Sequence, residues 1–409
     1  MKTSACETDW VGRLLAPEAG VREKLFETAP ALAPPQLVGE RHGVPMVVGE
    51  FWTAKQRAAH SLHEISYRAC FKPQLPAYFI QRFTAPGGRV LDPFMGRGTT
   101  LLEAAFHGRV PMGNDANPLS RWLLEPRLSP PTLQQIAARL EVLPLKPAPL
   151  EREDLLVFYH PDTLSEIETL RRHFLTSMPL APIDAWIRMV ATNRLTGHSP
   201  GFFSVYTMPP NQAVSIKSQI RINARRNQIP TYRDTRRLIL KKSKQLLADG
   251  APPPLKKRPT LLTGSADQLI GLTDGCVDLV VTSPPFLNVV QYDVDNWLRS
   301  WFCGVDADSV GLWMPKKLEV WLGLMRETFR ELHRVVRPGG AVAFEVGEVC
   351  KGSIPLDEPL LFTAREAGLV PEVVMIHDQE FTKTSHCWGI DNNAGGTNTH
   401  RILLLRRPD

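Results

Sequence analysis

A strand, a glycine turn and a helix follow one another early in the chain, and this succession constrains the fold more than any other feature. Arg89–Asp92 is a short strand candidate, and Thr99–His107 is a helix candidate that ends at Gly108. Between them, Gly96 and Gly98 let the backbone approach a ligand closely. The pattern predicts one unit of an α/β sheet with a ligand at its turn.

The polar residues around this turn favour a ligand that contains an amino acid. The amide groups at a helix N-terminus attract a carboxylate, which Thr99 and Thr100 can also bind. Asp92 can meet an ammonium group, and a dinucleotide fingerprint would need a third glycine where Leu101 stands. We therefore expect the methionine part of S-adenosylmethionine here. Asp115 ends the next strand, where it can accept hydrogen bonds from ribose hydroxyls or cap the following helix.

A second motif, Thr282-Ser283-Pro284-Pro285-Phe286, follows a nearly continuous apolar strand. The two prolines stiffen the loop, and Ser283 is held extended because a proline follows it. The Ser283 hydroxyl and the Pro284 carbonyl can accept the hydrogens of an amino group, while Phe286 offers a stacking face. An amino group on a heteroaromatic base is a poor nucleophile because its lone pair is delocalised. Two such acceptors favour a pyramidal nitrogen that can attack a methyl group.

Together the two motifs resemble those of the amino-methyltransferases that modify DNA, which carry D-P-F-x-G-x-G-T-T and (S/D/N)-P-P-(Y/F/W). The resemblance covers roughly residues 58–128 and 259–409. It implies an α/β, Rossmann-like methyltransferase fold with a seven-stranded, mostly parallel sheet and an antiparallel strand near the C-terminal end. It also implies S-adenosylmethionine as cofactor. The residues implied to bind it are Phe71, Lys72, Pro73, Asp92, Phe94, Gly96, Gly98, Thr99, Thr100, Asp115 and Asp267.

The resemblance further implies the reaction. A serine in the catalytic motif is more typical of methylation at cytosine N4, and an aspartate of methylation at adenine N6. We therefore expect site-specific N4-cytosine methylation of flipped bases in duplex DNA, with Ser283, Pro284, Pro285 and Phe286 as catalytic residues. Adenine N6, RNA, or a non-catalytic nucleic-acid-binding subunit are the alternatives. A carbon-5 cytosine enzyme is excluded because no cysteine follows a proline.

Residues 129–258 separate the two parts of this domain and are predicted to be mainly helical. From Lys217 to Arg258 there are thirteen Lys and Arg residues and two acids, a local net charge of +11 against +6 for the chain. The segment is therefore expected to bind DNA, the alternative being a solvated basic linker. It precedes the Gly264–Asp267 turn, although the family's alpha motif order would place it after that turn. The candidate DNA-binding residues are Lys217, Arg221, Arg225, Arg226, Arg233, Arg236 and Arg237.

The remaining features concern organisation. Residues 1–57 are interpreted as an N-terminal arm, and Pro126, Pro130 and Pro131 are expected to break the chain. The six cysteines are scattered without a C-x-x-C pair, and no apolar run of about 18 residues occurs, so a cytoplasmic protein without a structural metal is expected. A cognate restriction endonuclease is the expected functional partner. Further helices are predicted at 162–174, 183–195, 233–247 and 318–336, and further strands at 110–115, 261–264, 277–282, 341–346, 373–376 and 401–405.

Overall fold

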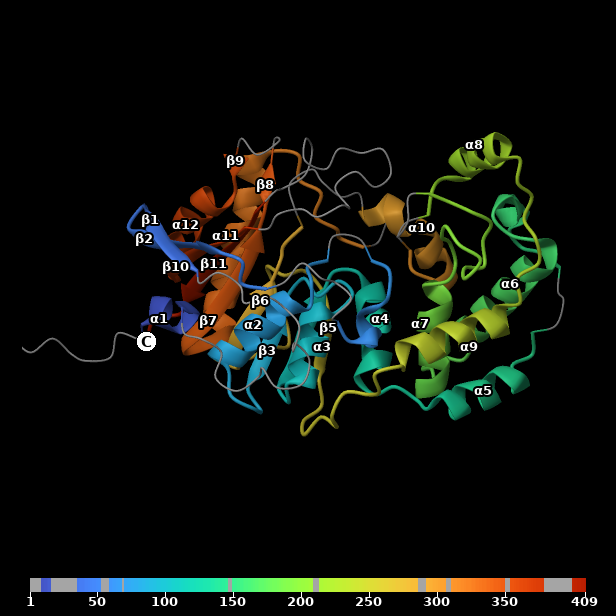
Figure 1. Ribbon diagram of the computed structural model, residues 1–409, viewed down its shortest axis with the longest axis horizontal. Helices are drawn as coiled ribbons and strands as arrows, with labels where there is room; N and C mark the ends of the chain where they lie inside the picture. Colours follow the sequence, from blue (N-terminus) through green and yellow to red (C-terminus); the bar gives the residue numbers. More distant parts are fainter. Residues whose placement is uncertain are drawn as a thin grey trace, which may run out of the picture.

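Within the described residues, nine strands form one sheet in the order β1-β2-β10-β11-β7-β6-β3-β4-β5 (Figure 1). The computed structural model describes residues 9–15, 35–52, 59–67, 70–145, 149–208, 213–285, 292–306, 310–349, 354–378 and 399–409. The strands of the sheet are β1 (Gln36–Arg41), β2 (Val44–Gly49), β3 (Arg89–Asp92), β4 (Val110–Asp115), β5 (Thr260–Thr263), β6 (Val277–Thr282), β7 (Val336–Val346), β10 (Val370–Asp378) and β11 (Thr399–Arg406). A separate two-stranded pair consists of β8 (Glu348–Val349) and β9 (Ile354–Pro355).

Seven of these strands confirm the predicted methyltransferase sheet. Strands β5, β4, β3, β6 and β7 lie side by side and parallel, and β11 runs antiparallel between β7 and β10. The connection after β3 leads to β4 on one side, whereas β6 lies on the other side of β3. The strand order therefore reverses between β3 and β6, and ligands of open α/β sheets bind at such a point, outside the carboxyl ends of the strands.

Two strands extend the sheet beyond the seven that were predicted. Residues 36–49, which were assigned to an N-terminal arm, form the hairpin β1–β2, and β2 pairs in parallel with β10. The reason is burial: Val44 and Val47 are at most 1% exposed and join the cores on the two faces of the sheet. The arm interpretation is therefore wrong for this hairpin.

Helices cover both faces of the sheet because its strands carry apolar residues on both sides. On β7, Val342 and Phe344 contribute to one core, while Ala341 and Ala343 contribute to the other. The first face packs against α11 (Leu318–Val335) and α12 (Asp357–Glu366). The second face packs against α1 (Trp10–Leu15) and α2 (Gln74–Phe83). Helix α3 (Thr99–Phe106) lies in contact with α2.

A second unit, mainly helical, lies beside the β5 edge of the sheet (Figure 1). It contains α5 (Leu133–Val142), η3 (Glu153–Val157), α6 (Pro161–Thr176), α7 (Pro182–Thr192), α8 (Ile216–Arg226) and α9 (Thr235–Leu246). Its core also includes α10 (Tyr292–Cys303) and a segment around the short helix η2 (Ser61–His63). Leu298 and Phe302 of α10 are fully buried there. The unit thus recruits residues from both sides of the predicted insert. None of the helices in the described part of the chain is long and apolar enough to cross a membrane.

Helix α4 (Pro118–Leu128) links the two units and continues through Pro126, where a break was predicted. Asn117 caps its start by accepting a hydrogen bond from the Leu119 N–H. The last turn is secured by Arg127, which is 0% exposed and donates to the carbonyl oxygens of Leu123 and Leu62 at 2.8 and 3.0 Å. The buried guanidinium thereby ties the last turn of α4 to the segment around η2.

Candidate active site

The glycine turn places backbone amides at the carboxyl end of β3. Gly96 and Gly98 have φ angles of 48° and 79°, in the left-handed region that favours glycine. A Cβ at Gly98 would lie 2.6 Å from Leu124 Cδ1, so close packing also requires glycine at that position. The Gly96 N–H donates to Asp115 Oδ2 at 2.8 Å and so joins the turn to the end of β4.

Asp92 lies at the centre of the site. Its Oδ1 accepts hydrogen bonds from the Thr282 hydroxyl at 2.6 Å and from the Phe94 N–H at 3.1 Å. The residue is 2% exposed, and burial raises its pKa to about 7 although these hydrogen bonds favour the charged form. Burial also raises the pKa of Asp115, which accepts from the Asn117 N–H at 2.8 Å. Two carboxyl groups with raised pKa values therefore flank the glycine turn.

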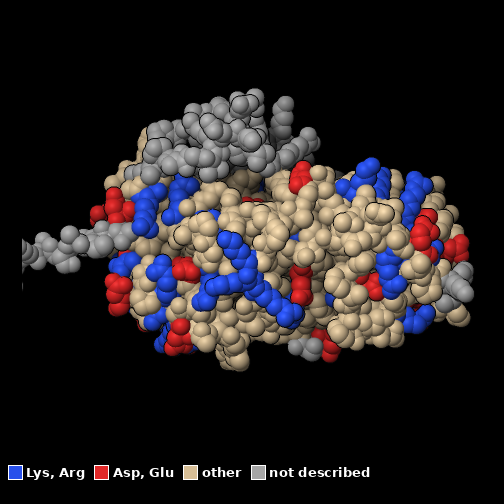
Figure 2. Space-filling model, turned by 90° about the horizontal axis from the view of Figure 1, so that it is seen from below, with Lys and Arg blue, Asp and Glu red and all other residues tan. Residues whose placement is uncertain are grey.

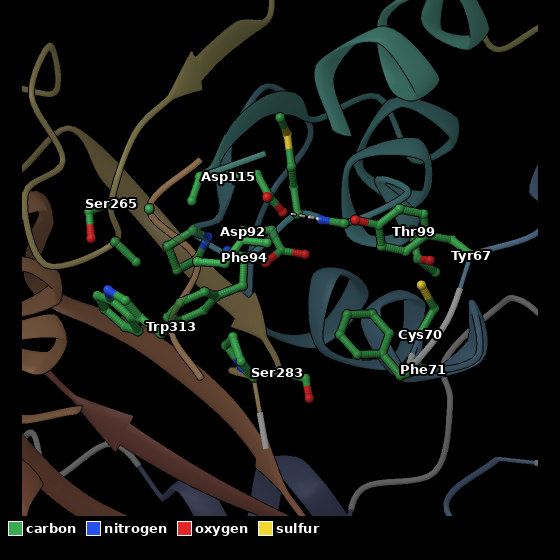
Figure 3. Close-up of a pocket in the computed structure, with 18 residues that line it drawn as sticks. Tyr67, Cys70, Phe71, Asp92, Phe94, Thr99, Asp115, Ser265, Ser283 and Trp313 are labelled. Atoms are coloured by element: carbon green, nitrogen blue, oxygen red, sulfur yellow. Dashed lines mark hydrogen bonds between the residues drawn. The ribbon is translucent and has the colours of Figure 1, made fainter. Parts of the chain in front are cut away.

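These groups border a cavity at the carboxyl edge of the sheet (Figure 3). The cavity runs from the glycine turn to the serine of the second motif, and the rings of Phe94 and Trp313 meet edge to face with centroids 5.7 Å apart in its wall. It is lined by Tyr67, Cys70, Phe71, Asp92, Pro93, Phe94, Met95, Gly96, Thr99, Asp115, Ala116, Ser265, Ala266, Ser283, Pro285, Gly311, Leu312 and Trp313. The two motifs predicted from the sequence therefore share one cavity.

Six of the eleven predicted cofactor residues line this cavity, and the other five, Lys72, Pro73, Gly98, Thr100 and Asp267, do not. Thr100 is fully buried and donates to the Val281 carbonyl at 3.1 Å, so it connects α3 to β6. Lys72 and Pro73 line a neighbouring hollow with His60, His63, Glu64 and Arg97. Those at the main cavity are Phe71, Asp92, Phe94, Gly96, Thr99 and Asp115.

Helix α11 holds the loop that the sequence predicts to be catalytic. Trp321 is 1% exposed, and its indole N–H donates to the Pro285 carbonyl at 2.9 Å. Because the Pro285 carbonyl accepts this bond, it is already engaged within the protein. The Ser283 side chain lies at the cavity. Pro284 is buried, and Phe286 lies outside the described residues.

Sequence reasoning missed several lining residues. Trp313 lies far from either motif in the sequence, and its neighbours give no pattern that predicts a cavity wall. Tyr67 and Cys70 directly precede the predicted cofactor segment at Phe71, and this proximity was the only available signal.

The residues present fit S-adenosylmethionine. The N-terminus of α3, which begins directly after the turn, suits the carboxylate of the cofactor. Asp92 and Asp115 suit its ammonium group and its ribose hydroxyls. Near the opposite wall, Asp267 Oδ1 is buried and has no hydrogen-bond partner among the described residues. A buried acceptor without a partner is costly, so an amino group of a bound adenine would satisfy it. Asp267 follows Ser265 and Ala266, which line the cavity.

Comparison with known proteins finds similarity to DNA methylases. A family model described as DNA methylase matches residues 39–118, which include β3, the glycine turn and β4. The chain is 23% identical over 283 residues to the Type II methyltransferase M.BsoBI of Geobacillus stearothermophilus, and this match covers 61% of this chain and 54% of that protein. It is 33% identical over 82 residues to M.MjaII of Methanocaldococcus jannaschii, covering 20% of this chain and 15% of that one.

The chain thus spans about half of the length of one of these relatives and a smaller part of the other. Among solved structures, TrmN from Thermus thermophilus matches 83% of this chain and 50% of its own chain at 13% identity, with a TM-score of 0.31. The fold assignment therefore depends on the strand order described above. The match of residues 39–118 to the DNA methylase model agrees with S-adenosylmethionine, the cofactor predicted from the glycine turn.

The basic residues of the helical unit divide into two groups. Arg236 is committed to the protein, since it donates to the carbonyl oxygens of Leu140 and Leu143 at 2.9 and 2.6 Å and so caps α5. Arg233 is partly buried. In contrast, Lys217, Arg221, Arg225, Arg226 and Arg237 are exposed. On the face of the protein in Figure 2, Lys and Arg are spread along the molecule with acids between them.

The raised pKa of Asp92 predicts a pH effect on stability. The folded protein retains the proton to about pH 7, whereas the unfolded chain loses it near pH 3.8, so stability falls as the pH rises between these values. Asp92→Asn removes the ionisable group and should gain stability relative to wild type over this window, reaching on the order of 4 kcal/mol above pH 7. Denaturant unfolding of both proteins without cofactor from pH 4 to 8 measures the difference. If the difference in unfolding free energy between the two proteins were constant across that pH range, the pKa of the buried Asp92 carboxyl would not be raised.

Proposed function

We propose that this protein transfers a methyl group from S-adenosylmethionine to the N4 amino group of cytosine in duplex DNA, at a specific sequence. The observation that carries the proposal is that Ser283 and the glycine turn line one cavity. Serine at this position, rather than aspartate, favours cytosine N4 over adenine N6, which is the second candidate. A cytoplasmic location remains a prediction from the cysteine pattern and the lack of a long apolar run, and a cognate restriction endonuclease remains a prediction from the resemblance.

When bound, S-adenosylmethionine supplies an electrophilic methyl group. The chain's own residues position the base amino group that receives the methyl group. Ser283 can accept a hydrogen from the base amino group, and Pro285 cannot turn away because Trp321 holds its carbonyl oxygen. The target base has to leave the duplex to enter the cavity, which costs a few kcal/mol. The aromatic wall of Phe94 and Trp313, together with the predicted stacking face of Phe286, offers apolar surface that offsets this cost.

Helix α8 is the part of the helical unit best suited to contact DNA. Lys217, Ile220, Arg221 and Arg225 are exposed at spacings of three and four residues, so they share one face of the helix. The helix contains no acidic residue, and Figure 1 shows it at the outer end of the unit. A basic helical face of this kind suits a phosphate backbone and the edges of bases in a groove.

Polar residues that could have contacted bases instead anchor α8. Gln219 and Gln228 both donate to the Tyr206 carbonyl, at 3.0 and 2.9 Å, and both donate to Asn223 Oδ1. Asn223 in turn donates to the Val157 carbonyl at 2.7 Å. This network fixes the orientation of the helix, so its basic face is presented at low entropic cost.

The identity of the product tests the proposed function. After incubation with S-adenosylmethionine and duplex DNA of mixed sequence, the DNA is digested to nucleosides and separated by mass. We expect N4-methylcytosine. N6-methyladenine alone would establish the second candidate, and methylation of RNA without methylation of DNA would refute both.

Ser283→Ala tests the catalytic role of the loop. The hydroxyl matters most as charge develops on the amino group, so the single-turnover rate should fall about a hundredfold to a thousandfold, with cofactor and DNA affinities nearly unchanged. Ser265→Ala, at another serine of the cavity wall, is the matched control and should retain a near-normal rate. A near-normal rate in Ser283→Ala would show that the loop has only a structural role.

A further inference from the structure

Arg97 stands between the two glycines of the turn, at a position that the motif D-P-F-x-G-x-G-T-T leaves variable. Its Nη1 donates to the carbonyl oxygens of His63 and Ile65, at 3.2 and 3.1 Å, and its Nε donates to Thr99 Oγ1 at 3.2 Å. The two carbonyl groups lie 34 and 32 residues earlier in the chain. Arg97 therefore joins the glycine turn to the segment of residues 61–67.

A second arginine holds the same segment. Arg127, in the last turn of α4, donates to the Leu62 carbonyl at 3.0 Å and also to the Arg97 carbonyl. The His63 side chain adds a contact with α3, because its Nε2 lies 2.7 Å from Glu103 Oε1. Leu62 and His63 are 0% and 4% exposed. Buried main-chain carbonyl groups require hydrogen-bond donors, and the two guanidinium groups supply them.

The segment ends at Tyr67, whose ring lies against the glycine turn. A Cβ at Gly96 would be 3.6 Å from Tyr67 Cε1, and Tyr67 lines the cavity. Figure 3 shows Tyr67 beside Thr99, on the side of the cavity opposite Trp313. The cofactor's carboxylate is expected at the N-terminus of α3, which begins at Thr99. Tyr67 therefore borders the place that suits the amino-acid part of the cofactor.

The helical unit holds segment 61–67 from the other side. The Ser66 N–H donates to Asn193 Oδ1 at 2.9 Å, and the Ser61 hydroxyl donates to the Leu246 carbonyl at 2.8 Å. Tyr67 is itself part of the core of that unit. Without the side-chain donors of the turn, the position of Tyr67 would be set by the helical unit and no longer by the turn.

We propose that Arg97 is a positioning residue of the cofactor site and that it acts through Tyr67. By holding segment 61–67 against the glycine turn, Arg97 keeps the Tyr67 ring in the cavity wall where the amino-acid part of S-adenosylmethionine binds. A guanidinium suits this role because its donors form a rigid fork, which here fixes two carbonyl oxygens and one hydroxyl. The inference rests on the cofactor of the proposed function and is independent of the target base.

Calorimetric titration with S-adenosylmethionine, without DNA, tests the proposal. Arg97→Met removes the donors and keeps most of the side-chain volume, so cofactor affinity should fall about tenfold, the scale of one lost hydrogen bond to a charged group. Arg97→Lys retains a charged donor and should recover most of the affinity. Tyr67→Leu should weaken binding to a similar extent as Arg97→Met. Because Arg97 acts through Tyr67, the double variant should bind no more weakly than Tyr67→Leu alone.

Arg109→Met is the matched control. Arg109 is also half-buried, and its guanidinium donates to Thr84 Oγ1 at 3.0 Å and to the Thr84 carbonyl at 2.7 Å. It directly precedes β4, at the amino end of that strand, and does not line the cavity. Its substitution should lower the thermal unfolding temperature by an amount similar to that in Arg97→Met, and should leave the cofactor affinity unchanged.

The outcomes separate the claims. Wild type that does not bind S-adenosylmethionine would refute the cofactor and with it the proposed function. Wild type that binds, with equal affinity in a folded Arg97→Met protein, would refute the positioning role alone. Equal losses of affinity in Arg97→Met and Arg109→Met would show that affinity follows stability, and would assign Arg97 a structural role only.

Two further outcomes concern the route through Tyr67. Losses that multiply in the double variant, to about a hundredfold, would show that Arg97 acts on the cofactor independently of Tyr67 and would overturn the proposed route. Wild-type affinity in Tyr67→Leu would overturn the proposal whether or not Arg97→Met folds.

Discussion

The rest of the structure depends on one hydrogen bond between the ends of two parallel strands. The Thr282 hydroxyl on β6 donates to Asp92 on β3 across 190 residues of sequence. The glycine turn begins after Asp92 and the Ser-Pro-Pro loop begins after Thr282, so this contact fixes one motif against the other. Thr100 adds a second connection, from the first turn of α3 to the Val281 carbonyl. The strand order supplies the framework, because it reverses between these two strands.

The helical unit is joined to the same place from two directions. Before the glycine turn, the segment that ends in Tyr67 contributes both to the unit's core and to the cavity wall. After the catalytic loop, α10 packs its Leu298 and Phe302 into that core. The two units therefore meet at the cavity, and a nucleic acid bound along the helical unit would bring its bases to the carboxyl edge of the sheet.

Prediction from the sequence was most successful where a recognisable motif lies beside a regular pattern of apolar residues. Apolar runs predicted the central strands, and the glycine turn predicted the cavity with Asp92 and Asp115 beside it. The hairpin at 36–49 was missed because its pairing with β10 joins residues more than 300 positions apart. The helix through Pro126 was missed because Arg127, which ties its last turn to the Leu62 carbonyl, meets this partner only in the folded state. Distant contacts of this kind leave no local pattern.

The central claim is that the glycine turn binds S-adenosylmethionine, and calorimetry tests it most directly. Gly96 and Gly108 both have positive φ, 48° and 68°, so a side chain strains the backbone at either position, but only Gly96 lines the cavity. We expect wild type and Gly108→Ala to bind the cofactor at one site, and Gly96→Ala to bind it at least tenfold more weakly, a loss of about 1.4 kcal/mol. Equal affinity in a folded Gly96→Ala protein, or no binding by wild type, would contradict the account.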